Sequence, residues 1–120
     1  MLLLDNKSVL IVEDEPFIAF DLADAITDAG ATVMGPALTV SEASEALDGA
    51  RPSIACLDIN IGTDFVWPIA QRLHDDGIPF VFVSASCTQS DLPLPFGNYQ
   101  CIAKPASQAD LIGKLSRLKG

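Results

Sequence analysis

The chain has 120 residues, of which 49% are apolar and 19% charged, so it can form one compact domain with a real core and is too hydrophobic for a disordered chain. Its net charge of −9 excludes the phosphate backbone of DNA or RNA as a direct partner, because that binding needs a basic surface. No apolar run approaches the length of a membrane span, and the opening residues 1–4 lack the basic flank of a secretory signal. We therefore expect one cytoplasmic domain over residues 1–120, with no membrane partner.

The first half of the chain alternates short apolar runs with amphipathic ones. Residues 8–12 (S-V-L-I-V) predict a strand that is buried on both faces. The apolar positions of residues 16–29 then follow helical spacing, and residues 32–34 predict a second short strand. Ser41 resembles the N-cap of a short helix that ends near Gly49.

The second half repeats this alternation. Residues 54–57 predict a third strand, and a helix is expected over residues 65–76. Residues 79–83 (P-F-V-F-V) carry the strongest strand signal of the chain, and residues 100–103 predict a weaker fifth strand. Ser107 is expected to cap a final helix.

Strands that alternate with helices indicate an α/β fold with a parallel sheet covered on both faces. We expect the flavodoxin-like, doubly wound arrangement with five strands in the order 2-1-3-4-5. Residues 85–99 break the alternation, because Pro93 and Pro95 each remove a helix donor and clash with the preceding turn. The fourth helix should therefore be shortened or replaced by a loop.

The three cysteines give an odd count without C-x-x-C spacing, so neither a disulfide framework nor a zinc site is predicted. We expect Cys56, Cys87 and Cys101 to be reduced thiols, with Cys56 inside a strand. His74 is expected to be a solvated surface residue. Trp67 and the phenylalanines are interpreted as packing residues.

Polar residues follow the strands at the edge where ligands bind in open α/β sheets. Each has a bland explanation when taken alone; Asp14, for example, could cap the following helix. Together they would place three carboxylates, a hydroxyl and a lysine on one edge, where a divalent cation would relieve the repulsion. Oxygen ligands of this kind suit Mg²⁺. These strand-end segments are Glu13-Asp14-Glu15, Asp58-Ile59-Asn60, Ser84-Ala85 and Lys104-Pro105.

Four ordered motifs, V-L-I-V-E-D-E-P, C-L-D-I-N, F-V-S-A and I-A-K-P, resemble the signature of the CheY-like response-regulator receiver family over essentially the whole chain. The resemblance implies a Mg²⁺ site in which Asp14 binds the ion directly and Glu13 acts mainly through metal-bound water. Asp58 and the backbone carbonyl of Asn60 would complete the protein ligands.

The same resemblance assigns the phosphoryl chemistry. Asp58 matches the phosphoacceptor, Ser84 the switch hydroxyl, and Lys104 the lysine that contacts the phosphoryl group. It also implies a cis peptide bond between Lys104 and Pro105. No other cofactor is expected, and the domain would not be an enzyme beyond its own phosphorylation and dephosphorylation.

Two departures from the family pattern are visible. Cys101 stands where the family usually has Tyr or Phe, and Gly62 stands where it commonly has proline. Residues 79–85 (P-F-V-F-V-S-A) resemble the P-F-x-F-A-T-G motif of alphaproteobacterial single-domain receivers that are linked to HWE-type histidine kinases.

We therefore expect a stand-alone receiver in two-component signal transduction. A histidine kinase, of the HWE type by resemblance, or a histidine phosphotransferase would supply the phosphoryl group, and a downstream protein would read the switch. The main alternative is a degenerate receiver that binds proteins independently of phosphorylation. A flavodoxin-like nucleotide binder would need a glycine-rich phosphate loop after the first strand. A Mg²⁺-dependent aspartyl phosphatase would need a second aspartate in D-x-D.

Overall fold

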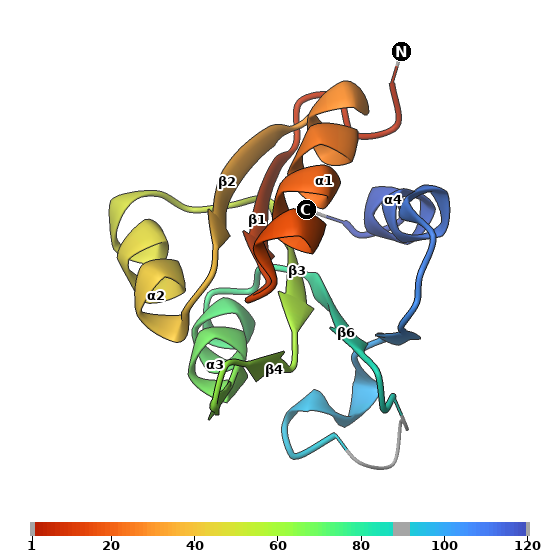
Figure 1. Cartoon of the computed structure of the whole chain (residues 1–120). Coiled ribbons are helices and arrows are strands. Elements are labelled where there is room, and N and C mark those ends of the chain that lie inside the picture. Colours follow the sequence, from red (N-terminus) through yellow and green to blue (C-terminus); the bar gives the residue numbers. More distant parts are fainter. Residues whose placement is uncertain (1, 88–91, 120) are drawn as a thin grey trace.

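The computed structural model describes residues 2–87 and 92–119. Five parallel strands form the central sheet: β1 (Ser8–Val12), β2 (Thr32–Ala37), β3 (Ile54–Asp58), β6 (Phe80–Ser84) and β7 (Cys101–Ala103). Their order across the sheet is β2-β1-β3-β6-β7 (Figure 1). The predicted doubly wound order is confirmed, with β6 and β7 as the fourth and fifth strands of the sheet.

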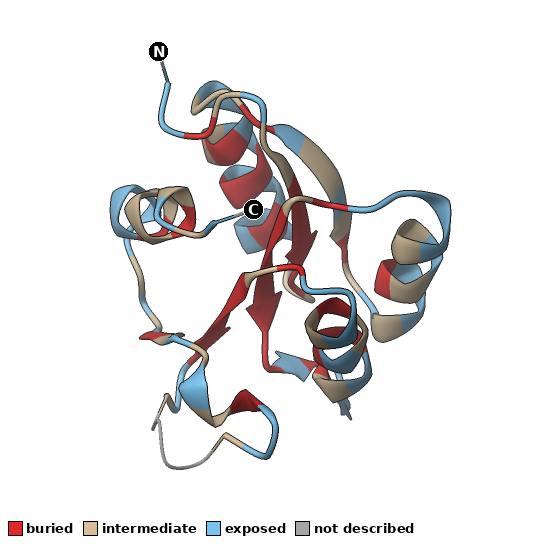
Figure 2. Cartoon of the chain, turned by 180° about the vertical axis from the view of Figure 1, so that it is seen from behind, coloured by how far each residue is buried: buried red, intermediate tan, exposed pale blue. Residues whose placement is uncertain are grey.

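Among the described residues, helices cover both faces of the sheet (Figure 1). Along β1, Val9 and Ile11 belong to one buried cluster, whereas Leu10 and Val12 belong to the other, as the alternation of a strand requires. The buried strands consequently form the middle layer of the molecule (Figure 2). No helix of the described residues is long and apolar enough to cross a membrane. The helices are α1 (Pro16–Asp28) and α4 (Gln108–Ser116) on one face, and α2 (Val40–Gly49) and α3 (Trp67–Asp75) on the other.

A small hairpin follows β3 and shortens the predicted third helix. Strands β4 (Asn60–Ile61) and β5 (Asp64–Phe65) pair antiparallel around a two-residue turn. Gly62 opens this turn with a φ of 63°, a conformation that glycine adopts without steric cost. The expected helix start at Phe65 is therefore wrong, because this residue pairs with Asn60 and α3 begins only at Trp67.

The N-cap of α2 is Thr39 and not Ser41, which lies inside the helix. The Thr39 hydroxyl accepts a hydrogen bond from the Glu42 N–H at 3.0 Å, and the Glu42 carboxylate accepts one from the Leu38 N–H at 2.9 Å. This arrangement resembles a capping box, in which two donors at the helix start are satisfied together. The predicted cap of α4, Ser107, is confirmed by its bond from the Asp110 N–H at 3.0 Å.

An aromatic cluster takes the place of a helix between β6 and β7. In the described part of this connection the helical element is one 3₁₀ turn, η2 (Phe96–Asn98), and residues 88–91 lie outside the described residues. Phe96 is buried against Trp67 and Phe82, with ring centroids 5.7 Å away in both cases. Tyr99 stacks on Phe80 at 4.1 Å. The predicted packing role is confirmed for Trp67 and for the three buried phenylalanines, and it is wrong for the three exposed ones. The buried rings are Phe80, Phe82 and Phe96, and the exposed ones are Phe17, Phe20 and Phe65.

His74 is part of this aromatic cluster, so its expected position in solvent is wrong. Its Nδ1 lies 2.9 Å from the Tyr99 hydroxyl, and its ring meets the edge of Phe96 at 6.2 Å. The histidine lies on α3, which packs on the same face of the sheet as η2. The side chain therefore ties the helix to the β6–β7 connection.

Two of the three cysteines form a disulfide, so the expectation of three free thiols is wrong. Cys87 and Cys101 are bonded, with their Cα atoms 5.7 Å apart. Cys87 comes shortly after β6 and Cys101 begins β7, and these strands are neighbours in the sheet. Cys56 is a free, buried thiol within β3, as predicted.

Candidate functional site

Three carboxylates meet at the carboxyl end of the two central strands. Val12 and Leu57 are partners in the β1–β3 ladder, so the residues that follow each strand end arrive side by side. Glu13 and Asp58 are only 5% and 8% exposed, whereas Asp14 is accessible to solvent. One oxygen from each of these three carboxylates lies within 4.8 Å of the others.

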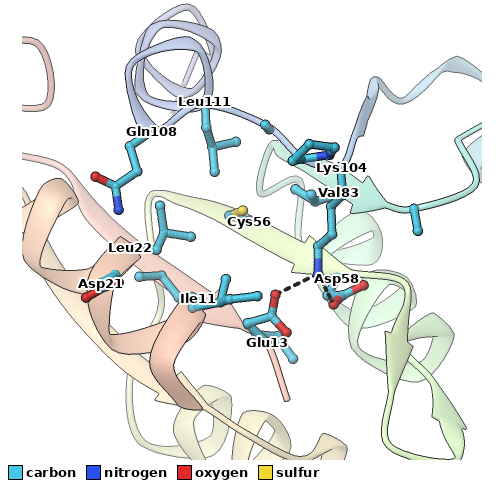
Figure 3. Close-up of a pocket in the computed structure, with 15 residues that line it drawn as sticks. Ile11, Glu13, Asp21, Leu22, Cys56, Asp58, Val83, Lys104, Gln108 and Leu111 are labelled. Atoms are coloured by element: carbon cyan, nitrogen blue, oxygen red, sulfur yellow. Dashed lines mark hydrogen bonds and ion pairs between the residues drawn. The ribbon is translucent and has the colours of Figure 1, made fainter. Parts of the chain in front are cut away.

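Lys104 bridges the two buried carboxylates. Its Nζ lies 2.8 Å from Glu13 Oε1 and 2.7 Å from Asp58 Oδ2 (Figure 3). The lysine follows β7, two strands away from Asp58, so its long side chain reaches back past the end of β6 to make these bonds. The peptide bond between Lys104 and Pro105 is cis, as predicted.

The electrostatics of this group depend on its burial. Burial away from water raises the pKa of Glu13, and the negative charge of Asp58 raises it further. The hydrogen bond from Lys104 lowers this pKa, but the net shift is upward. Burial alone would lower the pKa of Lys104, but its bonds to Asp58 and Glu13 outweigh that effect and raise the pKa above its usual value. Three carboxylates and one ammonium leave a net charge of −2 when all are ionised.

Ser84 ends β6 and is 3% exposed. Its hydroxyl accepts a hydrogen bond from the Ser86 N–H at 3.2 Å, and its carbonyl accepts one from the Lys104 N–H at 2.9 Å. The β6–β7 pairing thus joins the serine to the lysine through the backbone. Asn60, the remaining predicted site residue, is exposed at the start of β4 and donates its N–H to Asp58 Oδ1 at 3.3 Å.

The hairpin after β3 contributes a contact that the sequence did not predict. The Gly62 N–H donates a hydrogen bond to Asp14 Oδ2 at 2.8 Å. This bond links the turn between β4 and β5 to the carboxylate that follows β1. A glycine four residues after Asp58 signalled a different loop shape, but the sequence did not indicate that the loop would contact Asp14.

The donor set of the cluster fits a small divalent cation. All three side chains offer carboxylate oxygens, which are the hard ligands that Mg²⁺ prefers, and the exposed position of Asp14 leaves room for bound water. Lys104 bonds one oxygen each of Glu13 and Asp58. The other oxygens of these two carboxylates each accept one backbone N–H, at 3.1 and 3.3 Å, and a carboxylate oxygen has a further lone pair for a cation. The arrangement can therefore hold a cation and neutralise an incoming anion at Asp58.

A pocket of about 560 Å³ adjoins this cluster between α1 and α4 (Figure 3). Leu22 and Leu111 form its walls, and Cys56 lies between them at the sheet. Glu13, Asp58 and Lys104 are also part of the lining. Glu13, Asp58 and Lys104 therefore border this largely apolar pocket and are not covered by packed side chains on that side.

No family model matches the chain. Among curated proteins, the regulator PhyR of Methylorubrum extorquens is 34% identical over 80 residues, which are 64% of this chain and 30% of the relative. A solved PhyR from Bartonella quintana, described as an anti-anti-sigma factor, is 26% identical with a TM-score of 0.77 over 92% of this chain and 46% of its own. The chain therefore spans less than half the length of these relatives.

Two further solved structures match over nearly their whole length. A response regulator receiver protein from Sinorhizobium medicae is 26% identical, with a TM-score of 0.78 over 92% of both chains. The response regulator TrrA of Thermotoga maritima, solved with Mg²⁺ and BeF, is 21% identical with a TM-score of 0.79 over 94% of this chain and 99% of its own. This second similarity concerns the fold alone.

Proposed function

We propose that this chain, which has the fold of a CheY-like response-regulator receiver domain, accepts a phosphoryl group on Asp58 in a Mg²⁺-dependent reaction. The observation that carries the proposal is the bridge from Lys104 Nζ to Asp58 Oδ2 and Glu13 Oε1, beside the third carboxylate of Asp14. An aspartate at this place has a neutralising cation and two further acidic side chains within reach. Phosphoryl transfer mainly requires such positioning and charge neutralisation.

In the reaction, a carboxylate oxygen of Asp58 attacks the phosphorus of a phosphohistidine. The new P–O bond forms as the P–N bond breaks, and the released imidazole takes up a proton from water. Lys104 neutralises the charge that gathers on the phosphoryl oxygens. Asp14, Asp58 and the carbonyl of Asn60 would hold Mg²⁺, with Glu13 acting mainly through metal-bound water. The ion supplies further positive charge at those oxygens when bound.

The switch that follows involves Ser84. Its hydroxyl now accepts the Ser86 N–H, and the new phosphoryl oxygens on Asp58 would accept the hydroxyl proton of the serine instead. That movement pulls on the end of β6 and, through the Ser84–Lys104 backbone bond, on β7. The surface around these two strands would change its affinity for a downstream protein.

The phosphoryl donor is proposed to be a protein. Phe17, Ile18 and Phe20 lie at the start of α1 beside the acidic cluster and are 82%, 49% and 54% exposed. Apolar groups gathered at the surface are typical of a site that another protein covers. A cytoplasmic histidine kinase, of the HWE type by the motif in residues 79–85, or a histidine phosphotransferase would fit this position.

The test is the uptake of one phosphoryl group on incubation with Mg²⁺ and acetyl phosphate. Intact-mass spectrometry detects the added group. The wild-type protein should gain the group, and a chelator of Mg²⁺ should prevent it. Asp58→Asn should gain nothing while keeping its fold, because it lacks the attacking carboxylate. Asp64→Asn, which removes an exposed carboxylate of the neighbouring hairpin, is the matched control and should react like the wild type.

Labelled Asp58→Asn would refute the phosphoacceptor assignment. If the wild type binds Mg²⁺ without taking up the group, the degenerate receiver becomes the better description. Lys104→Ala tests the role of the lysine in the switch: it should still bind Mg²⁺, as monitored by Trp67 fluorescence, but should no longer change its partner affinity on phosphorylation.

A further inference from the structure

The disulfide lies close in sequence to Ser84 and Lys104, the two residues of the proposed switch. Cys87 is the third residue after Ser84, and Cys101 is the third residue before Lys104. Ser84 and Ala103 are partners in the β6–β7 ladder, so the two strand ends lie next to each other. The bond therefore joins the chain that leaves the serine to the strand that delivers the lysine.

The backbone beside Ser84 is restrained by this link. The serine hydroxyl accepts the Ser86 N–H and its carbonyl accepts the Lys104 N–H. The Ser86 N–H bonds this hydroxyl oxygen, so a movement of the hydroxyl toward Asp58 favours a displacement of residues 85–87. The disulfide opposes that displacement, because it fixes Cys87 to Cys101 with a Cα separation of 5.7 Å.

The three cysteines differ in their access to reagents. Cys87 and Cys101 are both half-buried, so they lie nearer to solvent than the buried Cys56. Cys56 is fully enclosed in β3, and burial raises the pKa of its thiol to about 12. A thiol in that state is a poor nucleophile, so Cys56 does not take part in exchange with the bonded pair.

We propose that Cys87–Cys101 is a thiol–disulfide exchange site, whose reduction by a dithiol frees Ser84 to respond to Asp58. The exchange stands on the disulfide alone, whereas its effect on the switch rests on the proposed function. In a cytoplasmic protein, disulfides are usually transient or redox-sensing and not structural. The disulfide lies between the segment after Ser84 and the strand before Lys104, so its reduction can change how freely these two residues move.

The exchange consumes one dithiol and transfers two electrons to the protein. A thiolate of the dithiol attacks one sulfur, the S–S bond breaks, and a mixed disulfide forms as the other cysteine leaves and takes up a proton. The second thiol of the reductant then attacks the mixed disulfide and releases the first cysteine. The two protons of the dithiol end on Cys87 and Cys101, and the reductant leaves as a disulfide.

The first experiment counts reactive thiols in the folded protein by alkylation and intact mass, before and after dithiothreitol. Two labels should appear on reduction, at Cys87 and Cys101. Cys56→Ala retains the bond and should still gain two labels, whereas the double variant Cys87→Ser/Cys101→Ser should gain none. A bond that resists dithiothreitol until the protein is unfolded would overturn the exchange site.

The second experiment tests the link to Ser84. Reduction should cause loss of hydrogen-exchange protection at the amides of Ser86 and Lys104, both of which bond to this serine. The apparent affinity for Mg²⁺ with beryllofluoride should rise by about fivefold or more, the lower range of coupling between sites. The double variant Cys87→Ser/Cys101→Ser should have the amide protection and analogue affinity of the reduced protein, and neither should change when the reductant is added.

Equal amide protection and equal analogue affinity in both redox states would overturn the coupling. Absence of analogue binding in either state would instead refute the proposed phosphoryl site. In that case the amide exchange of Ser86 and Lys104 still decides whether the disulfide restrains this part of the backbone, because that measurement needs no phosphoryl group.

Discussion

The two faces of the sheet are filled in different ways. On the α2–α3 face, the rings of Phe80 and Phe82 lie 5.1 Å apart and pack against Trp67, Phe96 and Tyr99. The α1–α4 face is lined by aliphatic side chains and keeps a pocket of about 560 Å³ beside the acidic cluster. In the described part of the connection between β6 and β7, aromatic side chains thus fill one face of the sheet, and free space remains on the opposite face.

Removing one central ring should produce the largest effect. Phe82→Ala deletes a fully buried side chain that contacts Phe80, Trp67 and Phe96. The free energy of unfolding should fall by about 3–5 kcal/mol, because the tightly packed rings leave a cavity when one is removed. Urea denaturation followed by circular dichroism measures this change.

The matched substitution on the other face is Leu111→Ala. Leu111 already lines the pocket, so fewer contacts are lost, and the expected cost is about 2 kcal/mol, at the lower end for a buried leucine. The difference between the two variants measures how unequally the faces are packed. Equal losses would show that the contrast between the faces has no energetic basis.

Reduction of the disulfide should have an effect on stability that lies between those of Phe82→Ala and Leu111→Ala. The bond closes a loop with a sequence separation of 14, for which the chain-entropy model gives a loss of about 3 kcal/mol on opening. Urea unfolding with and without dithiothreitol measures it, and Cys87→Ser is the control that should not respond to the reductant. An unchanged midpoint would mean that the aromatic cluster alone holds the connection.

A smaller loss is expected when Tyr99 loses only its hydroxyl. Tyr99→Phe keeps the stacking on Phe80 at 4.1 Å but removes the hydrogen-bonding group that faces His74 Nδ1. The free energy of unfolding should fall by about 1 kcal/mol, the usual contribution of one such bond. A loss as large as that of Phe82→Ala would point to a polar and not an aromatic origin of the packing on this face.

The smallest expected response concerns Cys56, which touches the pocket from the sheet. With a thiol pKa of about 12, almost no thiolate exists at a pH near 8, so iodoacetamide should leave the residue unmodified in the folded protein. Addition of urea should make it reactive. Modification under native conditions would show that iodoacetamide can enter the pocket between α1 and α4 and reach Cys56 in the sheet.

The main features of the fold follow from local patterns. Apolar runs such as residues 8–12 and 54–57 predict buried parallel strands, and the order of the sheet places the residues after them at one edge. The gathering of Glu13, Asp14, Asp58 and Lys104 is a consequence of that topology. Their chemical roles stay predictions, which the phosphoryl-uptake experiment addresses.

The features that the sequence did not reveal depend on contacts between distant segments. Cys87 and Cys101 meet because the connection after β6 doubles back to β7, and that path has no periodic signal. His74 is half-buried because α3 packs next to the segment that carries Tyr99. By contrast, the T-x-x-E pattern from Thr39 to Glu42 did hold the N-cap signal, and Ser41 was the wrong choice between two nearby hydroxyls.

The bridge formed by Lys104 has a consequence for how the domain exchanges ions with its surroundings. An ammonium tethered to the fold acts as an internal counter-ion between Glu13 and Asp58, so it offsets one of their two negative charges without a dissolved cation. Folding can therefore precede metal loading. An arriving divalent ion competes with a covalently attached monovalent one, and its occupancy would follow the cellular concentration of free magnesium instead of being fixed at synthesis.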